Sequence, residues 1–77
     1  MLTIGKTEDG QLTAFMDGVE KLYLTSGEIR RMVGVSRQTI WKWRNAGILP
    51  KAKVIKGVIY LPTRATLKAL TGRKIEL

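Results

Sequence analysis

Residues 35 to 50, VSRQTIWKWRNAGILP, alternate apolar and polar side chains with the period of an α-helix. Ile40 and Trp43 fall on one side of this helix, and basic and hydrogen-bonding groups occupy the other side. Ser36 can cap the first turn by accepting a hydrogen bond from a backbone N–H, and Gly47 can take the left-handed conformation that ends a helix. The pattern predicts a short helix with one side in a core and one side free to bind.

A second helix is predicted just before this one. The segment Thr25-Ser26-Gly27-Glu28 has capping-box spacing, in which the threonine hydroxyl and the glutamate carboxylate each accept a hydrogen bond from a backbone N–H. This helix begins near Ser26 and ends at Gly34. Its apolar stripe is formed by Ile29, Met32 and Val33. Two helices joined by a Gly-Val-Ser junction predict a helix-turn-helix, whose first helix braces the second.

Arg30 departs from the usual pattern of a helix-turn-helix. The position two residues after Glu28 faces the second helix in many such motifs, and it is usually small. Either the two helices cross more openly here, or the arginine stem extends outward so that the guanidinium reaches a phosphate. The sequence leaves both alternatives open.

The first 23 residues predict strands. Two Asp-Gly pairs, Asp9-Gly10 and Asp17-Gly18, separate runs of β-branched and apolar residues, which is typical of hairpin turns. The predicted strands of this meander are residues 2–7, 11–16 and 19–23. A two-residue turn at Asp9-Gly10 places Ile4 opposite Phe15. The meander either completes the core or forms a surface for self-association or another partner, and a frayed arm would have a similar composition.

After Pro50, the sequence KAKVIKGVIYLP contains two apolar runs around Lys56-Gly57, a two-residue loop that predicts a wing hairpin. This loop pairs Val54 with Ile59, Ile55 with Val58 and Lys53 with Tyr60. Both faces of the hairpin are then partly apolar. We expect one face to pack on the helices and the other to be covered by the N-terminal strands.

A last helix is predicted from Arg64 to Leu70, after a proline and before the terminator Gly72, with Leu67 and Leu70 facing the core. Together the elements predict an α+β fold, a winged helix-turn-helix with three short helices, a wing hairpin and an N-terminal β-meander. We expect a single domain over residues 1–77, with the N-terminal strands in 1–23, the winged helix-turn-helix in 24–70 and a frayed basic tail in 71–77.

Charge is distributed unevenly along the chain. Its 77 residues contain 14 Lys and Arg against 6 Asp and Glu, a net charge of +8, and its pI is near 10.3. Residues 1–24 hold 2 basic and 4 acidic side chains, whereas residues 25–77 hold 12 basic and 2 acidic ones. We therefore expect a polyanionic partner on the segment that carries the two helices and the wing.

The composition also excludes several classes of function. The chain contains neither Cys nor His, which rules out disulfides, zinc-finger ligands and a His-based catalytic dyad. With no carboxylate pair in an evident cleft, we expect no catalytic residue, no metal, no cofactor and no enzymatic activity. No apolar run reaches the roughly 20 residues of a membrane span and no signal pattern is present, so we expect a cytoplasmic protein, associated with the nucleoid of a bacterium or of a phage-infected cell.

Several short segments together carry a family resemblance. They are Leu24-Thr25, Gly34-Val35-Ser36, Thr39-Ile40-Trp41-Lys42-Trp43, Gly47 to Pro50, Lys56-Gly57 and Tyr60-Leu61-Pro62. Residues 24 to 70 resemble the winged helix-turn-helix of small phage excisionases and AlpA-type regulators, which is similar to the DNA-binding domain of MerR regulators. Arg30, the short wing and the unmatched first 23 residues depart from that pattern.

The resemblance implies a recognition helix in the major groove, a wing on the adjacent backbone or minor groove, and cooperative binding of several copies to repeated short sites. In excisionases such binding bends attachment-site DNA and directs an integrase toward excision. In the regulators it controls transcription. A MerR regulator also carries an effector domain after this module, and we expect no effector sensing and no small-molecule ligand here.

Ten residues are candidates for DNA binding. They are Ser36, Arg37, Gln38, Thr39, Trp41, Lys42, Arg44, Asn45, Lys53 and Lys56. We expect Arg37 and Gln38 to reach base edges from the first turn of the recognition helix, and Lys42 and Asn45 to do so from the second. The two hydroxyl residues approach a phosphate together with the helix N-terminus, and the two wing lysines hold the flanking backbone. Trp41 either packs on the DNA backbone or a thymine methyl, or covers the base of the wing.

Two functions from different classes remain open. The first is a sequence-specific double-stranded DNA-binding protein of a phage or mobile genetic element, with an excisionase (recombination directionality factor) role ahead of plain transcription regulation and an integrase as a candidate partner. The second is a protein-interaction module that uses the same fold, such as an antirepressor or a component of a DNA-packaging assembly. DNA affinity that falls linearly with salt on logarithmic axes, with preference for one repeat, distinguishes the first from the second.

Overall fold

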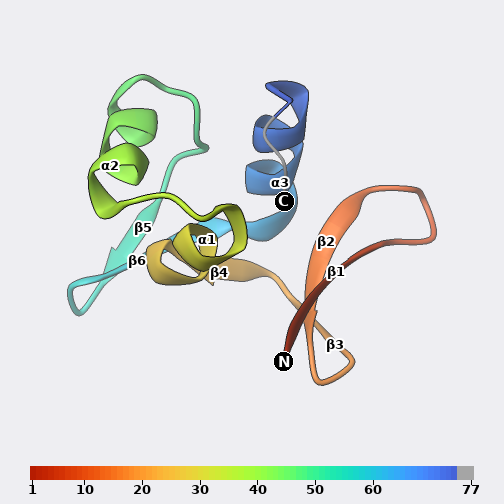
Figure 1. The fold of residues 1–77 in the computed structure, drawn as a ribbon. Coiled ribbons are helices and arrows are strands. Elements are labelled where there is room, and N and C mark those ends of the chain that lie inside the picture. The colour runs from red at the N-terminus through yellow and green to blue at the C-terminus, as the bar shows by residue number, and fades with distance from the viewer. Residues whose placement is uncertain (75–77) are drawn as a thin grey trace.

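Three helices and two antiparallel sheets make up the computed structural model, which describes residues 1–74 (Figure 1). The strands are β1 (Leu2–Lys6), β2 (Leu12–Met16), β3 (Val19–Lys21), β4 (Tyr23–Thr25), β5 (Lys53–Ile55) and β6 (Val58–Pro62). The helices are α1 (Ser26–Val33), α2 (Arg37–Asn45) and α3 (Thr63–Gly72). The predicted α+β winged helix-turn-helix is confirmed. The part of the predicted tail in residues 75–77 lies outside the described residues.

The N-terminal meander has the strand order β1-β2-β3. Its second turn is the predicted two-residue turn, because Met16 pairs with Val19 and both Asp17 (φ 51°) and Gly18 (φ 83°) take positive φ values. Positive φ at both central residues defines the turn whose twist matches the twist of the strands. The meander is therefore an ordered sheet rather than a frayed arm.

The first turn differs from the expectation by one residue. Ile4 pairs with Ala14 instead of Phe15. The loop between the strands has three residues, because the Thr7 N–H donates to the Gln11 carbonyl at 2.8 Å. A one-residue change of register moves a side chain to the other face of a strand. Ile4 therefore shares its face with the buried Ala14.

The third predicted strand is divided between two sheets. Instead of one strand over residues 19–23, β3 ends at Lys21, the chain bends at Leu22, and β4 pairs with β6 in a second sheet of order β4-β6-β5. The Leu22 carbonyl accepts a hydrogen bond from the Thr63 N–H at 3.0 Å. This contact holds the bend against the start of α3.

The core lies beneath the three helices. Its buried apolar residues are Ala14, Leu24, Ile29, Ile40, Leu49, Leu61, Leu67 and Leu70. The residues predicted to face inward are confirmed, since Ile29, Ile40, Leu67 and Leu70 are buried, and Met32, Val33 and Trp43 pack against the cluster half-buried. Helix α3 is longer than predicted at both ends: it begins at Thr63 with Pro62 as its N-cap, and it includes Gly72, so that Arg73 takes the C-cap.

The expected cover over the wing is wrong. The N-terminal sheet packs through β2 against α3, on the opposite side of the molecule from the wing hairpin (Figure 1). Both faces of the wing are largely open, with Val54 61% and Ile55 54% exposed, and Ile59 packs half-buried against the core. The bend at Leu22 is the physical reason, because it turns β3 away from β4 before the sheet can extend over the hairpin.

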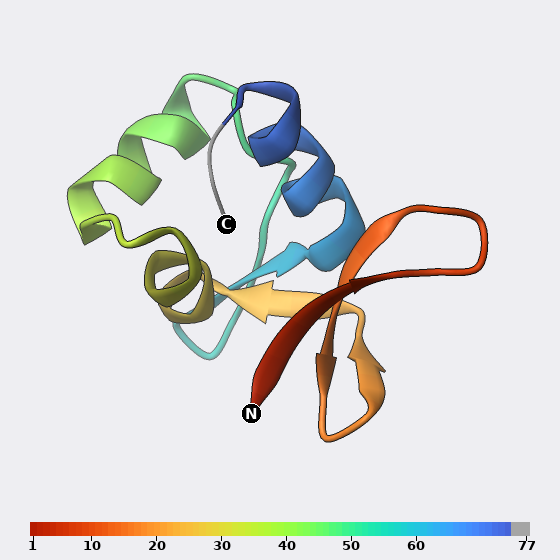
Figure 2. The same ribbon diagram turned by 45° about the vertical axis from the view of Figure 1, so that its right-hand side comes forward.

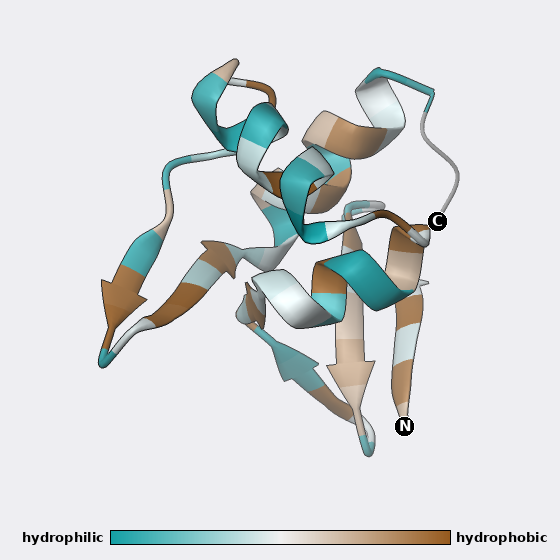
Figure 3. Ribbon diagram, turned by 60° about the vertical axis from the view of Figure 1, so that its left-hand side comes forward, coloured by the Kyte–Doolittle hydropathy of each residue, from teal (hydrophilic) through white to brown (hydrophobic). Residues whose placement is uncertain are grey.

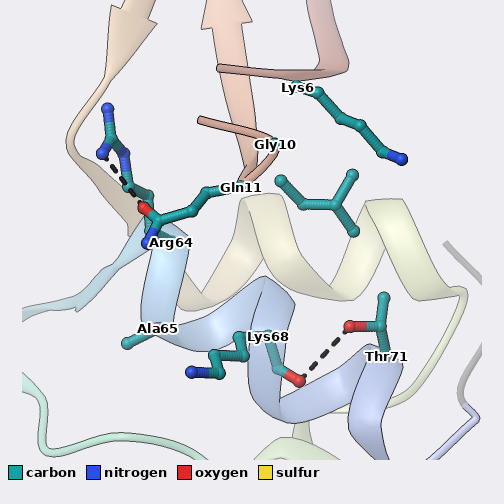
Figure 4. Close-up of a pocket in the computed structure, with 8 residues that line it drawn as sticks. Lys6, Gly10, Gln11, Arg64, Ala65, Lys68 and Thr71 are labelled. Carbon is teal, nitrogen blue, oxygen red and sulfur yellow. Dashed lines mark hydrogen bonds between the residues drawn. The ribbon is translucent and has the colours of Figure 1, made fainter. Parts of the chain in front are cut away.

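An ion pair ties the meander to α3. Arg64 donates to both carboxylate oxygens of Glu20, at 2.8 and 2.9 Å. It also donates to the Gln11 side chain at 3.1 Å (Figure 4). The buried Thr13 hydroxyl donates to the same carboxylate at 2.7 Å. Two parallel N–H···O bonds fix direction as well as distance. The Arg64 guanidinium is therefore engaged within the protein.

Acid should weaken this link. The hydrogen bonds from Arg64, and then from Thr13, lower the pKa of Glu20 from 4.5 to about 2. A carboxylate with a lowered folded-state pKa stabilises the protein above its unfolded pKa, and that contribution is lost as the pH falls through the folded value. The free energy of unfolding, measured by urea denaturation, should therefore decrease between pH 4.5 and pH 2. Glu20→Gln should flatten part of this decrease, and an unchanged pH profile would contradict the role of the pair.

Candidate nucleic-acid interface

Helix α2 is capped as its sequence predicts. The Ser36 hydroxyl accepts a hydrogen bond from the Thr39 N–H at 3.2 Å. At the other end Gly47 has φ 75°, and the Ile48 N–H donates to the Trp43 carbonyl at 2.9 Å. Such a bond closes the last turn behind a left-handed glycine. Figure 2 shows that α2 lies at the edge of the molecule, far from the N-terminal sheet.

The two sides of α2 face different surroundings. Ile40 is buried at 3% exposure, and Trp43 packs half-buried against the core. Gln38, Lys42 and Asn45 lie on the opposite side and are exposed. This outward side carries amide and ammonium groups, which can bond to base edges and phosphates.

A third side of α2 faces a groove. Arg37, Trp41 and Arg44 follow the spacing i, i+4, i+7 and line a groove of about 590 Å³ between α2, the start of α1 and the wing. Trp41 is 62% exposed and lines this groove together with Gly57, Val58 and Ile59 of the wing. The α2 residues predicted to bind DNA therefore divide into two groups. Gln38, Lys42 and Asn45 face outward, whereas Arg37, Trp41 and Arg44 face the groove.

Some candidate groups are already hydrogen-bonded within the protein. The Asn45 side-chain nitrogen donates to the Trp41 carbonyl one turn earlier, at 3.0 Å. The hydroxyls of Ser36 and Thr39 lie 3.1 Å apart and share a hydrogen bond. Asn45 must break this bond before it can present both its amide oxygen and its amide nitrogen to a base. The Gln38 side chain forms no such bond within residues 1–74.

The wing has the predicted register. Lys53 pairs with Tyr60, Val54 with Ile59 and Ile55 with Val58. Lys56 (φ 50°) and Gly57 (φ 79°) form the two-residue turn and place the exposed Lys56 side chain at the tip. The two wing lysines are not equivalent, because the Lys53 ammonium lies 5.6 Å from the centre of the Tyr23 ring, at the base of the wing. Figure 3 shows apolar residues along both strands of this hairpin.

Negative charge is absent from this half of the sequence. Between Glu28 and Glu76 the chain contains no Asp or Glu. The basic side chains of α2 and the wing therefore have no carboxylate from their own segment to neutralise them. Such a surface attracts a polyanion over a distance of about 10 Å at moderate salt.

Comparison with known proteins decides the family. A family model described as a helix-turn-helix domain matches residues 23–71. The chain belongs to this helix-turn-helix family. The family includes small proteins of the AlpA and excisionase type, so the resemblance predicted from the sequence is confirmed, and DNA is the partner that the domain supports. Searches of curated proteins and of solved structures found no match.

Membership in a DNA-binding family favours a non-enzymatic role. None of the helices within residues 1–74 has the length and apolar character needed to cross a membrane.

The ten candidate residues predicted from the sequence did not include one basic residue that lies beside α2. Arg30 of α1 lines the groove beside Arg37 and Arg44, and the sequence signal that marked Arg30 was its departure from the usual small residue.

The cap of α2 can be tested separately from DNA contacts. Ser36→Ala removes the acceptor for the Thr39 N–H and should lower the free energy of unfolding by about 1 kcal/mol in urea denaturation. Ser36→Asp is the matched control, because its carboxylate caps the helix and suits the positive end of the helix dipole. The aspartate variant should keep its stability but bind DNA less tightly, since its charge repels a phosphate. Equal DNA affinity for Ser36→Asp and the wild type would show that this helix end does not approach the backbone.

Proposed function

We propose that this protein binds double-stranded DNA sequence-specifically, with residues Ser36 to Asn45 in the major groove and the wing on the flanking backbone or minor groove. It acts as an excisionase (recombination directionality factor), as a transcriptional regulator, or as both, in a phage or mobile genetic element. One observation carries the proposal: the outward side of α2 exposes Gln38, Lys42 and Asn45 in a segment without carboxylates. That side has no partner within the described part of the chain that would cover it.

Each side chain has a chemical role in this proposal. The Gln38 amide matches the donor and acceptor pair on adenine, and Arg37 matches guanine or a phosphate. Lys42 and Asn45 extend the contacts toward the second turn of the helix. The tip residue Lys56 contacts the flanking phosphates as a point charge. Ser36 and Thr39 bring the N-terminus of α2 to the backbone.

The size of the interface favours several copies per site. Helix α2 has 9 residues, and at 1.5 Å per residue it is about 14 Å long, so one molecule reads only a few base pairs. Cooperative binding to short repeats supplies the affinity that a single copy lacks, and an integrase bound beside the array is the candidate protein partner. Bending of the DNA between copies would then direct recombination.

Footprinting on the DNA region that encodes the protein tests this proposal. The purified protein is titrated at two salt concentrations, first in a gel shift and then in nuclease protection. A stepwise ladder over direct repeats beside an attachment site supports the excisionase role, and a single protected site over a promoter supports the regulator. Salt-sensitive smearing with no protected sequence contradicts the proposal and favours the protein-interaction alternative.

Two variants should separate base reading from backbone binding. Gln38→Ala should cost about 1–3 kcal/mol of binding free energy on the preferred site and little on random DNA, because only the base contact is lost. Lys56→Ala should weaken binding to both DNAs and lower the salt slope by about one ion. Fluorescence anisotropy on the two duplexes measures both effects. Equal losses for Gln38→Ala on the two duplexes would remove Gln38 from the base-reading set.

A further inference from the structure

Arg30 has an unusual position for a charged side chain. It lies in α1 and lines the groove between α1, α2 and the wing. Its Nε is shielded from solvent and has no hydrogen-bond partner among the residues that the structure describes. An N–H of a charged group that is removed from water without an acceptor costs folding free energy. The free protein therefore holds an arginine with one shielded N–H donor, that of Nε, left without an acceptor.

The groove around Arg30 is strongly basic. Arg37 and Arg44 of α2 line it together with Arg30, so that two helices contribute three guanidinium groups, and no carboxylate is among its lining residues. None of the three arginines forms an ion pair within residues 1–74. Three like charges around one hollow repel one another, and an anion between them relieves that repulsion.

The start of α1 also lines this hollow. Ser26 and Gly27, the first two residues of the helix, line the groove. Their N–H groups belong to the first turn, which has no intrahelical acceptors, and the helix dipole favours negative charge at that end. The Glu28 carboxylate does not occupy the groove, because it accepts hydrogen bonds from Thr25 and Lys21 and lines a different hollow.

We propose that this groove binds a phosphate of the DNA backbone and that Arg30 is the residue that holds it, with Arg37 and Arg44 on the opposite wall. The inference rests on the proposed DNA-binding function and adds a contact from α1 to those made by the outward side of α2 and by the wing tip. The planar guanidinium offers two parallel N–H donors to a phosphate, which suits a phosphodiester better than a point charge would. Binding gives the guanidinium the acceptors that it lacks in the free protein.

The groove also determines the geometry of docking. It lies between the helix that reads bases and the wing that holds the flanking strand, so a phosphate seated there sets the position of both on the DNA. A backbone contact carries no sequence information but fixes register. Loss of Arg30 should therefore weaken binding to every DNA by the same factor.

The test compares Arg30→Met with Arg31→Met in anisotropy titrations over a range of salt, on the footprinted site and on random-sequence duplex. Arg31 is the matched control, because it is the next residue of α1, has the same charge and lines a different hollow with Glu28. Arg30→Met should weaken binding to both duplexes about tenfold and lower the salt slope by about one ion. Arg31→Met should weaken it by less than about twofold.

Equal effects of the two substitutions would overturn the phosphate site. The proposed function would survive that result if the wild-type protein still preferred its footprinted site. If the wild-type protein itself bound no DNA in a salt-dependent manner, the proposed function would fail and the inference with it. The two failures are therefore distinguishable in one set of titrations.

Thermal denaturation distinguishes a phosphate contact from a structural role. Because Arg30 Nε has no partner in the free protein, Arg30→Met should leave the Tm unchanged or raise it, in contrast to its effect on DNA binding. A lower Tm together with weaker binding would assign Arg30 to the scaffold and overturn the inference.

Ethylation interference locates the phosphate itself. Ethylating one phosphate at the groove should block the wild-type protein, whereas Arg30→Met should tolerate ethylation at that position and remain blocked at the others. Arg30→Gln replaces Arg30→Met in this experiment if the methionine variant does not fold. Identical interference patterns for the wild type and the variant would overturn the proposed contact.

Discussion

The Glu28 carboxylate joins the three parts of this small protein. One oxygen accepts from the Thr25 backbone N–H at 2.9 Å and closes the capping box of α1, and the other accepts from Lys21 of β3 at 2.7 Å. Burial raises the pKa of Glu28, but the hydrogen bonds from Lys21 and Thr25 outweigh it and leave the pKa below its usual value. The start of the helix-turn-helix, the second sheet and the N-terminal meander therefore share one ionised group.

The carboxylates of the N-terminal part stabilise the scaffold and leave the interface basic. Glu20 pairs with Arg64, Glu28 with Lys21, and Asp17 with the N-terminal ammonium at 3.3 Å. These pairs lie on the meander and its junctions, away from α2 and the wing. An exposed pair such as that of Asp17 contributes little free energy, whereas the bidentate Glu20 pair fixes orientation. The separation of charge along the chain thus becomes a separation of surfaces, one that holds the fold and one that attracts DNA.

Arg30 illustrates how a binding site can work against stability. A small residue at this position would leave no unpartnered N–H, whereas the Nε of Arg30 has no acceptor among the described residues. Residues that break a local rule of packing or hydrogen bonding are expected at functional sites. In the phosphate site proposed between α1, α2 and the wing, three guanidinium groups that repel one another within the protein line the same groove.

Local chemistry along the chain determined the helices and turns. The capping box at Thr25, the caps at Ser36 and Gly47, and the hairpin turns at Asp17-Gly18 and Lys56-Gly57 depend on neighbours within a few residues, so they can be predicted from the sequence. The basic, carboxylate-free segment and the outward amide and ammonium groups of α2 were likewise apparent, because helical periodicity assigns residues to sides.

Tertiary structure decided where those elements meet. The bend at Leu22 and the packing of the meander on α3 involve contacts between distant segments, namely the Leu22 carbonyl with the Thr63 N–H and Glu20 with Arg64. Periodicity could not show that the wing lies beside α1 and α2, so the groove and the place of Arg30 in it could not be derived from the sequence. A pattern along one helix orders its own side chains, but a site between elements depends on how their axes pack.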